Sequence, residues 1–539
     1  MRPGSRLEDH RSHGGRHALR GSIHDRTRWG ASGPLSLALY LLALATLVVH
    51  APPDIWDPEA RAFLLLVGWI AIWRYGWGAV HLIRSLLYRG IVFKRWRVRL
   101  DRLRAADPDA GKALLAPELF LVVTTYRVRS EITMAAFEAA IAEARRYPGP
   151  ATVVASIVEM ADQRLIKELF QLRVTEPQVR LVLVREQGSG KRDGLAAALR
   201  AVARRMPPPG ALVLVQDGDT VLPPGCLERT VPFFRLLPQV AALTTDEDCL
   251  VPGASALLRA WHRLRFAQRH VLMSSMALSG RLITMTGRMS IYRAEIATDP
   301  GFIAAIQHDS LDHWRLGRLR LLTGEDKTAA WWLLRQGYRT LYVPDLRVLS
   351  VEEPPAPGLL RASTPLMRRW FGNMLRMSGR CIALGPGRLG WFTWWCLIDQ
   401  RISMWTPLVG PVAVTLLALA VSPVFLYAYL VWVMGTRFLQ NLALLTARPL
   451  VSGLYPPLLY FTQVYGAFIK TWVLFRLDRQ RWTRQDVSWA PELERWQAGL
   501  RAAGSLGLHL LALTALVAAV AVATGVLPLP SAATLAAVR

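Results

Sequence analysis

The sequence predicts an α/β domain with a mainly parallel sheet, embedded between groups of α-helical transmembrane segments. The 539-residue chain is apolar overall, with 52% hydrophobic residues and a mean hydropathy of +0.24, although 19% of its residues are charged. Its apolar residues gather towards both ends, whereas residues 115–350 have the mixed composition of an aqueous domain. In that domain short β-rich runs alternate with helical stretches, a pattern typical of parallel sheets.

The expected strands lie at 120–125, 152–158, 179–184, 211–216 and 340–343. Helical stretches separate the first four of them, as in repeated βαβ units. A sheet of this kind binds ligands at the carboxyl ends of its strands. The chemical motifs of the chain are therefore expected at that edge.

Apolar runs outside this domain are close to the roughly 20 residues that a bilayer core requires. The run at 455–475 has basic flanks on both sides, so an interfacial or re-entrant path is preferred to a span. The expected boundaries are a disordered basic cytoplasmic tail at 1–33, a transmembrane hairpin at 34–83, a basic connector at 84–117, the α/β domain at 118–360, interfacial amphipathic helices at 361–403, a second hairpin at 404–446, an interfacial or transmembrane segment at 454–476, a basic cytoplasmic segment at 477–500 and a last span at 505–527.

The net charge of +26 raises the possibility of a nucleic-acid-binding protein. The arginines, however, crowd the flanks of the apolar runs, where cytoplasmic loops of membrane proteins carry them. We therefore expect contact with membrane lipids, no nucleic acid, and a cytoplasmic α/β domain. Arg74, inside an apolar run, fits either a polar interior or the interface. The cysteines are scattered without metal-ligand spacing, which indicates neither a zinc site nor a disulfide framework.

Asp217-Gly218-Asp219 directly follows an apolar strand. Carboxylates at such a strand end can hold Mg²⁺ or Mn²⁺ against a nucleotide diphosphate. An exposed Asp-Gly-Asp turn is the alternative. The motif predicts a divalent-cation site at Asp217 and Asp219, with Asp217 also close to the bound nucleotide diphosphate.

Glu325 and Asp326 begin a helical stretch. A carboxylate in this position could take the proton of an attacking hydroxyl group, as a general base does. The alternative is an acidic pair that is favoured only by the helix dipole. Arg369 and Trp370 suit diphosphate binding and stacking on a sugar ring, or an interfacial anchor.

Two further stretches carry candidate binding residues. Lys191, Arg192 and Asp193 follow a glycine-containing loop that enters a helix, with cations suited to phosphate and an acid suited to sugar hydroxyls. The spacing of an ATP-binding P-loop is absent. Glu159 follows an apolar strand, where a charged loop residue is the alternative.

Taken in order, these motifs resemble those of processive family 2 glycosyltransferases, relatives of cellulose and hyaluronan synthases, although Leu366 stands where that family has glutamine. The chain is more similar still to the glycosyltransferase subunits of bacterial alginate polymerases. The stretches that carry this resemblance are 155–160, 190–194, 217–220, 264–270, 285–290, 308–317 and 478–486.

The resemblance implies a GT-A fold and an inverting, processive transfer of mannuronate from GDP-mannuronate to a growing β-1,4-linked polysaccharide. It also implies a bacterial inner membrane, a co-polymerase subunit that senses cyclic di-GMP, and periplasmic export proteins. It makes Asp326, beside Glu325, the general base. It assigns Asp217 and Asp219 to the metal and diphosphate, and Arg369 and Trp370 to the acceptor end. The remaining substrate contacts it suggests are Glu159, Lys191, Arg192, Asp193, Thr286, Gly287 and Arg288.

Alternatives remain at this point. The chain could be a family 2 synthase of another β-linked polymer, or a transporter or scaffold that binds nucleotides without turnover. A uronate donor would require an additional cation near the site, for which Arg127, Arg192 and Arg288 are candidates.

Overall fold

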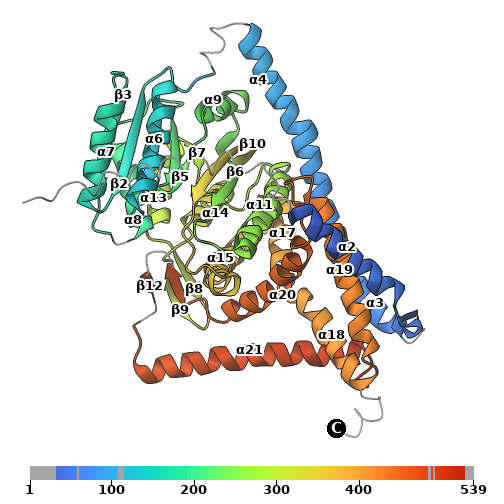
Figure 1. Cartoon of the computed structure of the whole chain (residues 1–539). Helices are drawn as coiled ribbons and strands as arrows, with labels where there is room; N and C mark the ends of the chain where they lie inside the picture. The colour runs from blue at the N-terminus through green and yellow to red at the C-terminus, as the bar shows by residue number, and fades with distance from the viewer. Residues whose placement is uncertain are drawn as a thin grey trace, which may run out of the picture.

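The computed structural model describes residues 32–56, 60–106, 114–188, 190–482, 487–489 and 492–528 of the chain. Nearly all of the tail expected at 1–33 lies outside these described residues. An α/β domain occupies the middle of the chain, and long helices from both ends of the chain lie beside it and below it in the view of Figure 1.

An eight-stranded sheet forms the centre of the α/β domain, in the order β3-β2-β1-β4-β7-β6-β10-β5. Four neighbouring pairs are parallel, whereas β7 and β5 run antiparallel to their neighbours. The mainly parallel sheet predicted from the sequence is confirmed. Its strands are β1 (Leu119–Thr124), β2 (Ala151–Ile157), β3 (Val179–Arg185), β4 (Leu212–Asp217), β5 (Thr220–Val221), β6 (Val240–Leu250), β7 (Ser290–Arg293) and β10 (Arg339–Val351).

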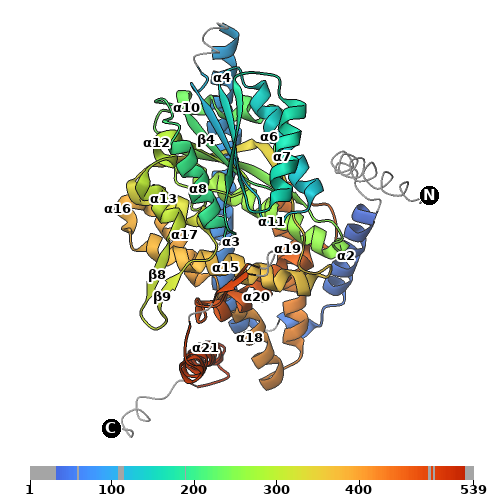
Figure 2. The ribbon, with the colours of Figure 1, turned by 90° about the vertical axis from the view of Figure 1, so that its left-hand side faces the viewer.

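Helices cover both faces of the sheet, with α6 and α7 on one side and α8 and α13 on the other (Figure 2). The central strand β1 is apolar along nearly its whole length because both of its faces are buried. In β1, Leu119 to Val123 are at most 1% exposed. The helices of the domain are α6 (Ser130–Arg146), α7 (Met160–Arg173), α8 (Lys191–Ala203), α9 (Cys226–Thr230), α10 (Phe233–Leu236), α11 (Ala256–Ala277), α12 (Ala294–Ala297), α13 (Pro300–Gln307) and α14 (Glu325–Gln336).

The remaining helices come from the two ends of the chain. They are α2 (Ser32–Val49), the 3₁₀ turn η2 (Pro53–Trp56), α3 (Ala60–Leu87), the π-helical segment η3 (Tyr88–Phe93), α4 (Lys94–Ala106), α15 (Leu359–Ile382), α16 (Gly385–Leu389), α17 (Trp391–Ile402), α18 (Thr406–Ala420), α19 (Val424–Leu444), α20 (Tyr455–Leu474) and α21 (Arg495–Ala523). Two antiparallel hairpins, β8 (Ser310–His313) with β9 (Gly317–Arg320) and β11 (Gln480–Trp482) with β12 (Val487–Trp489), lie outside the main sheet.

Two helical stretches of the described residues, Trp391–Ala420 and Arg495–Ala523, are long and apolar enough to cross a membrane, and Gly33–Val49 is apolar but shorter. Their length and composition support membrane association. The helix α3, expected to span, carries Arg74, His81 and Arg84 within its length.

A second hydrophobic core joins the α/β domain to these helices. It is formed by α11, α15 and α20, with Trp261, Leu366 and Leu459 among its buried side chains. The first core surrounds the sheet. Because α15 contributes to the second core and also lies at the carboxyl-end edge of the sheet, the helical region and the α/β domain share one packed interface.

Candidate active site

The order of the strands creates a crevice at the carboxyl ends of β1 and β4. The chain passes from β1 outwards to β2 and β3, then returns to β4 on the other side of β1. Thr124 of β1 is in register with both Ser156 of β2 and Asp217 of β4. A reversal of this kind leaves a crevice in which open α/β sheets bind ligands. A cavity of about 350 Å³ lies at this edge and is called the donor cavity below.

The Asp-Gly-Asp motif forms a tight turn between β4 and β5 at the wall of the donor cavity. The amide of Gly218 donates to the carbonyl of Thr124 over 2.7 Å. A Cβ atom at Gly218 would lie 2.7 Å from the Cβ of Thr125, so glycine is required for this close approach. Asp217 and Asp219 both line the cavity, and Asp219 is only 7% exposed. The motif is therefore not an exposed surface turn.

Lys191, at the start of α8, links two of the predicted carboxylates. Its ammonium lies 2.6 Å from Asp217 and contacts Glu325 as well. Burial would raise the pKa of Glu325, but the charges of Lys191 and Arg192 hold it at about 2. Burial raises the pKa of Asp217 despite Lys191, and the nearby charges of Asp219 and Glu325 raise it further. Three carboxylates thus act on one another around a single ammonium group.

The acidic pair at the start of α14 is divided between two roles. Gly324 precedes the helix in a left-handed conformation, with φ of 94°. Glu325 is buried on Lys191, and its second oxygen accepts from the amide of Gly324. Asp326 is half-buried, lines the donor cavity and accepts a 3.0 Å hydrogen bond from the hydroxyl of Thr284. Both acids line the donor cavity, and Asp326, the more exposed of the two, lies where a general base that faces a substrate would have to lie.

Gly287 and Arg288 also line the donor cavity, whereas Thr286 is buried and bonded to Thr244. A Cβ atom at Gly287 would lie 2.8 Å from the ammonium of Lys191 and 3.1 Å from Asp217. The backbone therefore passes directly beside this ion pair. Arg288 pairs with the carboxylates of Glu247 and Glu352, which fix its guanidinium at the cavity wall.

Arg369 and Trp370, predicted at the acceptor end, lie on α15 and line the donor cavity. The indole of Trp370 stacks on Trp261, with ring centroids 5.8 Å apart and planes at 24°. The guanidinium carbon of Arg265 lies over the same indole, 3.4 Å from its ring centroid. Packing against α11 therefore fixes the orientation of Trp370. Leu366, the departure from the family pattern, lines the same cavity.

Besides Thr286, three predicted substrate contacts lie away from the described lining of the cavity. Glu159 is exposed at the start of α7. Arg192 is 4% exposed and donates to the carbonyls of Ile306 and Thr323, which ties α8 to α13 and to the turn before α14. Asp193 accepts from the side chain of Gln307. The positions of Arg192 and Asp193 support roles in holding the site together.

Sequence reasoning missed several residues that line the site. Glu352 and Glu353 follow β10 and line the donor cavity, and Trp482 of β11 reaches it from the far end of the chain. Trp482 packs against Tyr126 with ring centroids 6.1 Å apart. The apolar residues Val348, Leu349 and Val351 precede Glu352, but the strand expected at 340–343 ended before them, whereas β10 continues to Val351. The position of Trp482 depends on tertiary folding alone.

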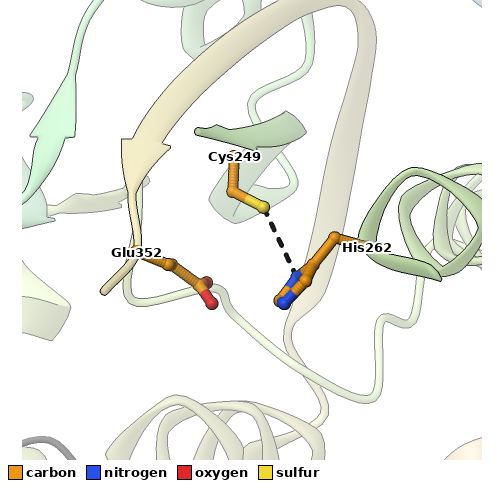
Figure 3. Close-up of side chains that lie close together, drawn as sticks. All are labelled: Cys249, His262 and Glu352. Atoms are coloured by element: carbon orange, nitrogen blue, oxygen red, sulfur yellow. Dashed lines mark hydrogen bonds between the residues drawn. The ribbon is translucent and has the colours of Figure 1, made fainter. Parts of the chain in front are cut away.

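A buried group of mixed ligands lies next to this cavity (Figure 3). Ligand atoms of Cys249, His262 and Glu352 lie within 4.8 Å of one another, and Cys249 is 3.5 Å from the Nδ1 atom of His262. Burial raises the pKa of the Cys249 thiol and lowers that of His262 to about 4. The pKa shifts favour a neutral thiol, and the guanidinium of Arg288 already pairs with Glu352. Both features oppose cation binding at this group.

Asp217 and Asp219 fit a divalent cation better. Their carboxylates are hard oxygen ligands, which Mg²⁺ and Mn²⁺ prefer. At position 287 the glycine lets the backbone pass close to Asp217, where a Cβ atom would lie 3.1 Å from its carboxylate. Burial, together with the charges of Asp219 and Glu325, raises the pKa of Asp217, and a cation would relieve the repulsion among these carboxylates.

Comparisons with known proteins decide the family. The model of the family "Glycosyltransferase like family 2" matches residues 117–373, which include the whole of the site up to Asn373 on α15. Glycosyltransferase alg8 of Pseudomonas syringae pv. tomato is 44% identical over 459 residues, 85% of this chain and 91% of that protein. The chain belongs to the glycosyltransferase alg8 family. The alg8 protein of Azotobacter vinelandii is 42% identical over 476 residues, 88% of this chain and 94% of that protein.

Membership of the alg8 family confirms that the chain is a glycosyltransferase, as its motifs predicted. A glycosyltransferase of family 2 takes a nucleotide-sugar donor and an acceptor, and the α/β domain is of the predicted GT-A type. Among solved structures, the mannosyltransferase PcManGT from Pyrobaculum calidifontis, in complex with GDP-Man and Mn²⁺, is 17% identical with a TM-score of 0.38. The match covers 73% of this chain and 97% of that one.

Proposed function

We propose that this alg8-family enzyme polymerises mannuronate from GDP-mannuronate into β-1,4-polymannuronate, the precursor of alginate. Its support is the family membership together with the resemblance of the motifs to those of alginate polymerase subunits. The single structural observation that carries the reaction is that Asp217, Asp326 and Trp370 all line one cavity. This arrangement brings a diphosphate end, a base and an acceptor platform together.

In the proposed reaction, the terminal hydroxyl of the polymer attacks the anomeric carbon of the donor sugar. Its proton passes to the carboxylate of Asp326, which the Thr284 hydroxyl orients. The bond between that carbon and the diphosphate breaks as the new glycosidic bond forms, so GDP leaves with the bonding electrons. Direct displacement on an α-linked donor inverts the centre and gives a β-linkage.

The diphosphate end of the donor is placed against the Asp-Gly-Asp turn. A divalent cation, Mg²⁺ or Mn²⁺, would be held by Asp217 and Asp219 and would neutralise charge on the leaving diphosphate. Arg369 at the same cavity contributes a further cation for the diphosphate. Lys191 keeps Asp217 and Glu325 together before the donor arrives.

Product passes from this site towards the membrane helices. A second cavity, of about 810 Å³, is lined by α3, α11, α15, α18, α19 and α20. Trp370 lines both cavities, so the acceptor platform stands at their junction. We propose that the polymer leaves through this second cavity, called the exit cavity below.

The enzyme is proposed to lie in the bacterial inner membrane with several spans and a cytoplasmic catalytic domain. The two membrane-length helices and the basic flanks of the apolar runs support this topology. The resemblance to alginate polymerases supports a co-polymerase subunit that senses cyclic di-GMP, and periplasmic export proteins, as partners.

Incorporation of radiolabelled donors by purified membranes tests the proposal. GDP-mannuronate should label polymer of high molecular mass, whereas GDP-mannose and UDP-glucose should not. Labelling from another donor would make the chain a synthase of a different polymer. Nucleotide binding without any transfer would make it a transporter or scaffold.

A further inference from the structure

The exit cavity has an unusual set of charges on its wall. Its charged lining residues are the cations Arg74, Arg265, Arg437 and Lys470, and no aspartate or glutamate is among the described residues that line it. Three glutamines, Gln268, Gln440 and Gln463, supply most of the remaining long polar side chains. A cavity among apolar helices that gathers positive charge only is electrostatically incomplete, because a buried charge is costly without a counter-charge.

Among the residues that the structure describes, one of these cations has an ionic partner. Arg74 pairs with Asp399 on α17. For Arg265, Arg437 and Lys470, the described part of the chain offers no carboxylate within ion-pair distance. Arg437 donates to the hydroxyl of Tyr75 over 2.6 Å, and its buried Nε atom has no hydrogen-bond partner among the described residues.

These three cations are held over aromatic rings instead. Arg265 lies over Trp370, with its guanidinium carbon 3.4 Å from the ring centroid. Lys470 lies 4.8 Å from the ring centroid of Phe371. The arrangement keeps each side chain in place and leaves its donors able to reach an anionic ligand. The same aromatic surfaces suit the apolar faces of sugar rings.

The cations are also spread along the path of the proposed product. Arg265 on α11 stands at Trp370, where the donor cavity and the exit cavity meet. Lys470 on α20 and Arg437 on α19 continue the wall among the membrane-side helices. A polymer with one carboxylate on each sugar would meet cations at successive places, whereas a neutral polymer would leave them unpaired.

Resting on the proposed function, we propose that the exit cavity is a binding site for an acidic polysaccharide, in which Arg265, Arg437 and Lys470 pair with carboxylates of the polymer. These residues thereby select a polyuronate over a neutral glycan after the sugar has been transferred. Charge complementarity and the continuity with the donor cavity at Trp370 favour this occupant over an anionic phospholipid.

Oligosaccharide binding to the full-length, detergent-solubilised protein tests the inference. The probes are an octasaccharide of β-1,4-linked mannuronate and the neutral β-1,4-linked mannose octasaccharide. Arg265→Gln, Arg437→Gln and Lys470→Gln should each weaken binding of the charged probe about tenfold, the loss expected for one charge-assisted contact. Binding of the neutral probe should change less than about threefold, on the same scale.

Two controls separate the role of charge from effects on folding. Arg84→Gln removes an arginine of α3 that lies over Phe392 and is not among the lining residues, so both probes should bind as in the wild type. Arg265→Lys keeps the positive charge and should restore much of the binding that Arg265→Gln loses. Thermal unfolding of each variant is measured alongside.

Three results would overturn the inference. They are unchanged binding of the charged probe in all three glutamine variants, equal loss of both probes, and binding of phosphatidylglycerol that depends on these cations while the charged probe does not bind. The incorporation assay answers a different question. If the wild type fails to polymerise mannuronate while its binding of the charged probe depends on these cations, the proposed donor is wrong and the acidic-polymer site stands.

Discussion

The ammonium of Lys191 lies 2.6 Å from the carboxylate of Asp217 at the wall of the donor cavity, and it also contacts Glu325, the acid that begins α14. One ammonium at the start of α8 thereby joins the carboxyl end of β4 to the start of α14, two elements far apart in the sequence. Removing it would leave the buried carboxylate of Glu325 and the half-buried carboxylate of Asp217 without their counter-charge, which is costly.

Lys191→Gln is therefore expected to destabilise the protein most at neutral pH. In the wild type the pKa of Glu325 is held at about 2, below its ordinary value, so this group stabilises the fold above the ordinary pKa and the stabilisation is lost as pH falls towards 2. Without Lys191 that pKa rises, so this stabilisation is reduced at neutral pH and less of it remains to be lost in acid. Thermal unfolding of the solubilised protein, followed by tryptophan fluorescence, should have a lower midpoint in the variant at neutral pH, and the difference from the wild type should shrink as pH falls. An unchanged midpoint would mean that the ion pair contributes nothing to stability.

Asp217→Ala and Asp219→Ala are each expected to lower polymer synthesis by roughly 100-fold or more, because the diphosphate loses its cation. Both variants should remain in the membrane at wild-type levels. Asp312→Ala, at an exposed acid on the β8–β9 hairpin, is the matched control and should keep full activity. Full polymer yield from either site variant would show that the turn has no part in donor binding.

Asp326→Asn separates proton transfer from binding. The amide keeps the shape and can still accept from Thr284, so donor affinity should stay within about threefold while the transfer rate falls roughly 1,000-fold. Glu325→Gln should behave differently, since it breaks the pair with Lys191 and so weakens donor binding. Single-turnover assays with saturating donor distinguish the two. Equal losses of affinity in both variants would contradict the division of roles.

The sheet was predictable where its strands are plain apolar runs. Strands β1 to β4 matched the expected ranges closely, because each contains a run of apolar residues. In β1 and β2, burial on both faces explains that run. Strand β6 escaped prediction, since its second half contains Asp246 and Glu247, whose burial depends on arginines from distant elements. Strand β7 has only four residues, too few for a periodic pattern.

The site was predictable where chemistry follows a strand or begins a helix, as at Asp217 and Asp326. The site was less predictable where a side chain could point either into the protein interior or into the cavity. Arg192 begins α8 beside Lys191, yet it points into the protein and Lys191 lines the cavity. Trp482 could not be placed at all, because its contact with Tyr126 joins segments more than 350 residues apart.

The close backbone approach at Gly287 yields the last prediction. A Cβ atom there would lie 2.8 Å from the ammonium of Lys191, nearer than real Cβ atoms approach their neighbours. Because the lysine chain is flexible, Gly287→Ala should displace its ammonium from Asp217 and leave the fold intact. We expect the KM for donor to rise about tenfold, the equivalent of one lost contact of about 1.4 kcal/mol, with unfolding temperature unchanged. Gly387→Ala, at a glycine with open space around it, is the matched control. A KM equal to that of the control would show that Lys191 can move without cost to donor binding, and that its ion pair with Asp217 does not shape the donor site.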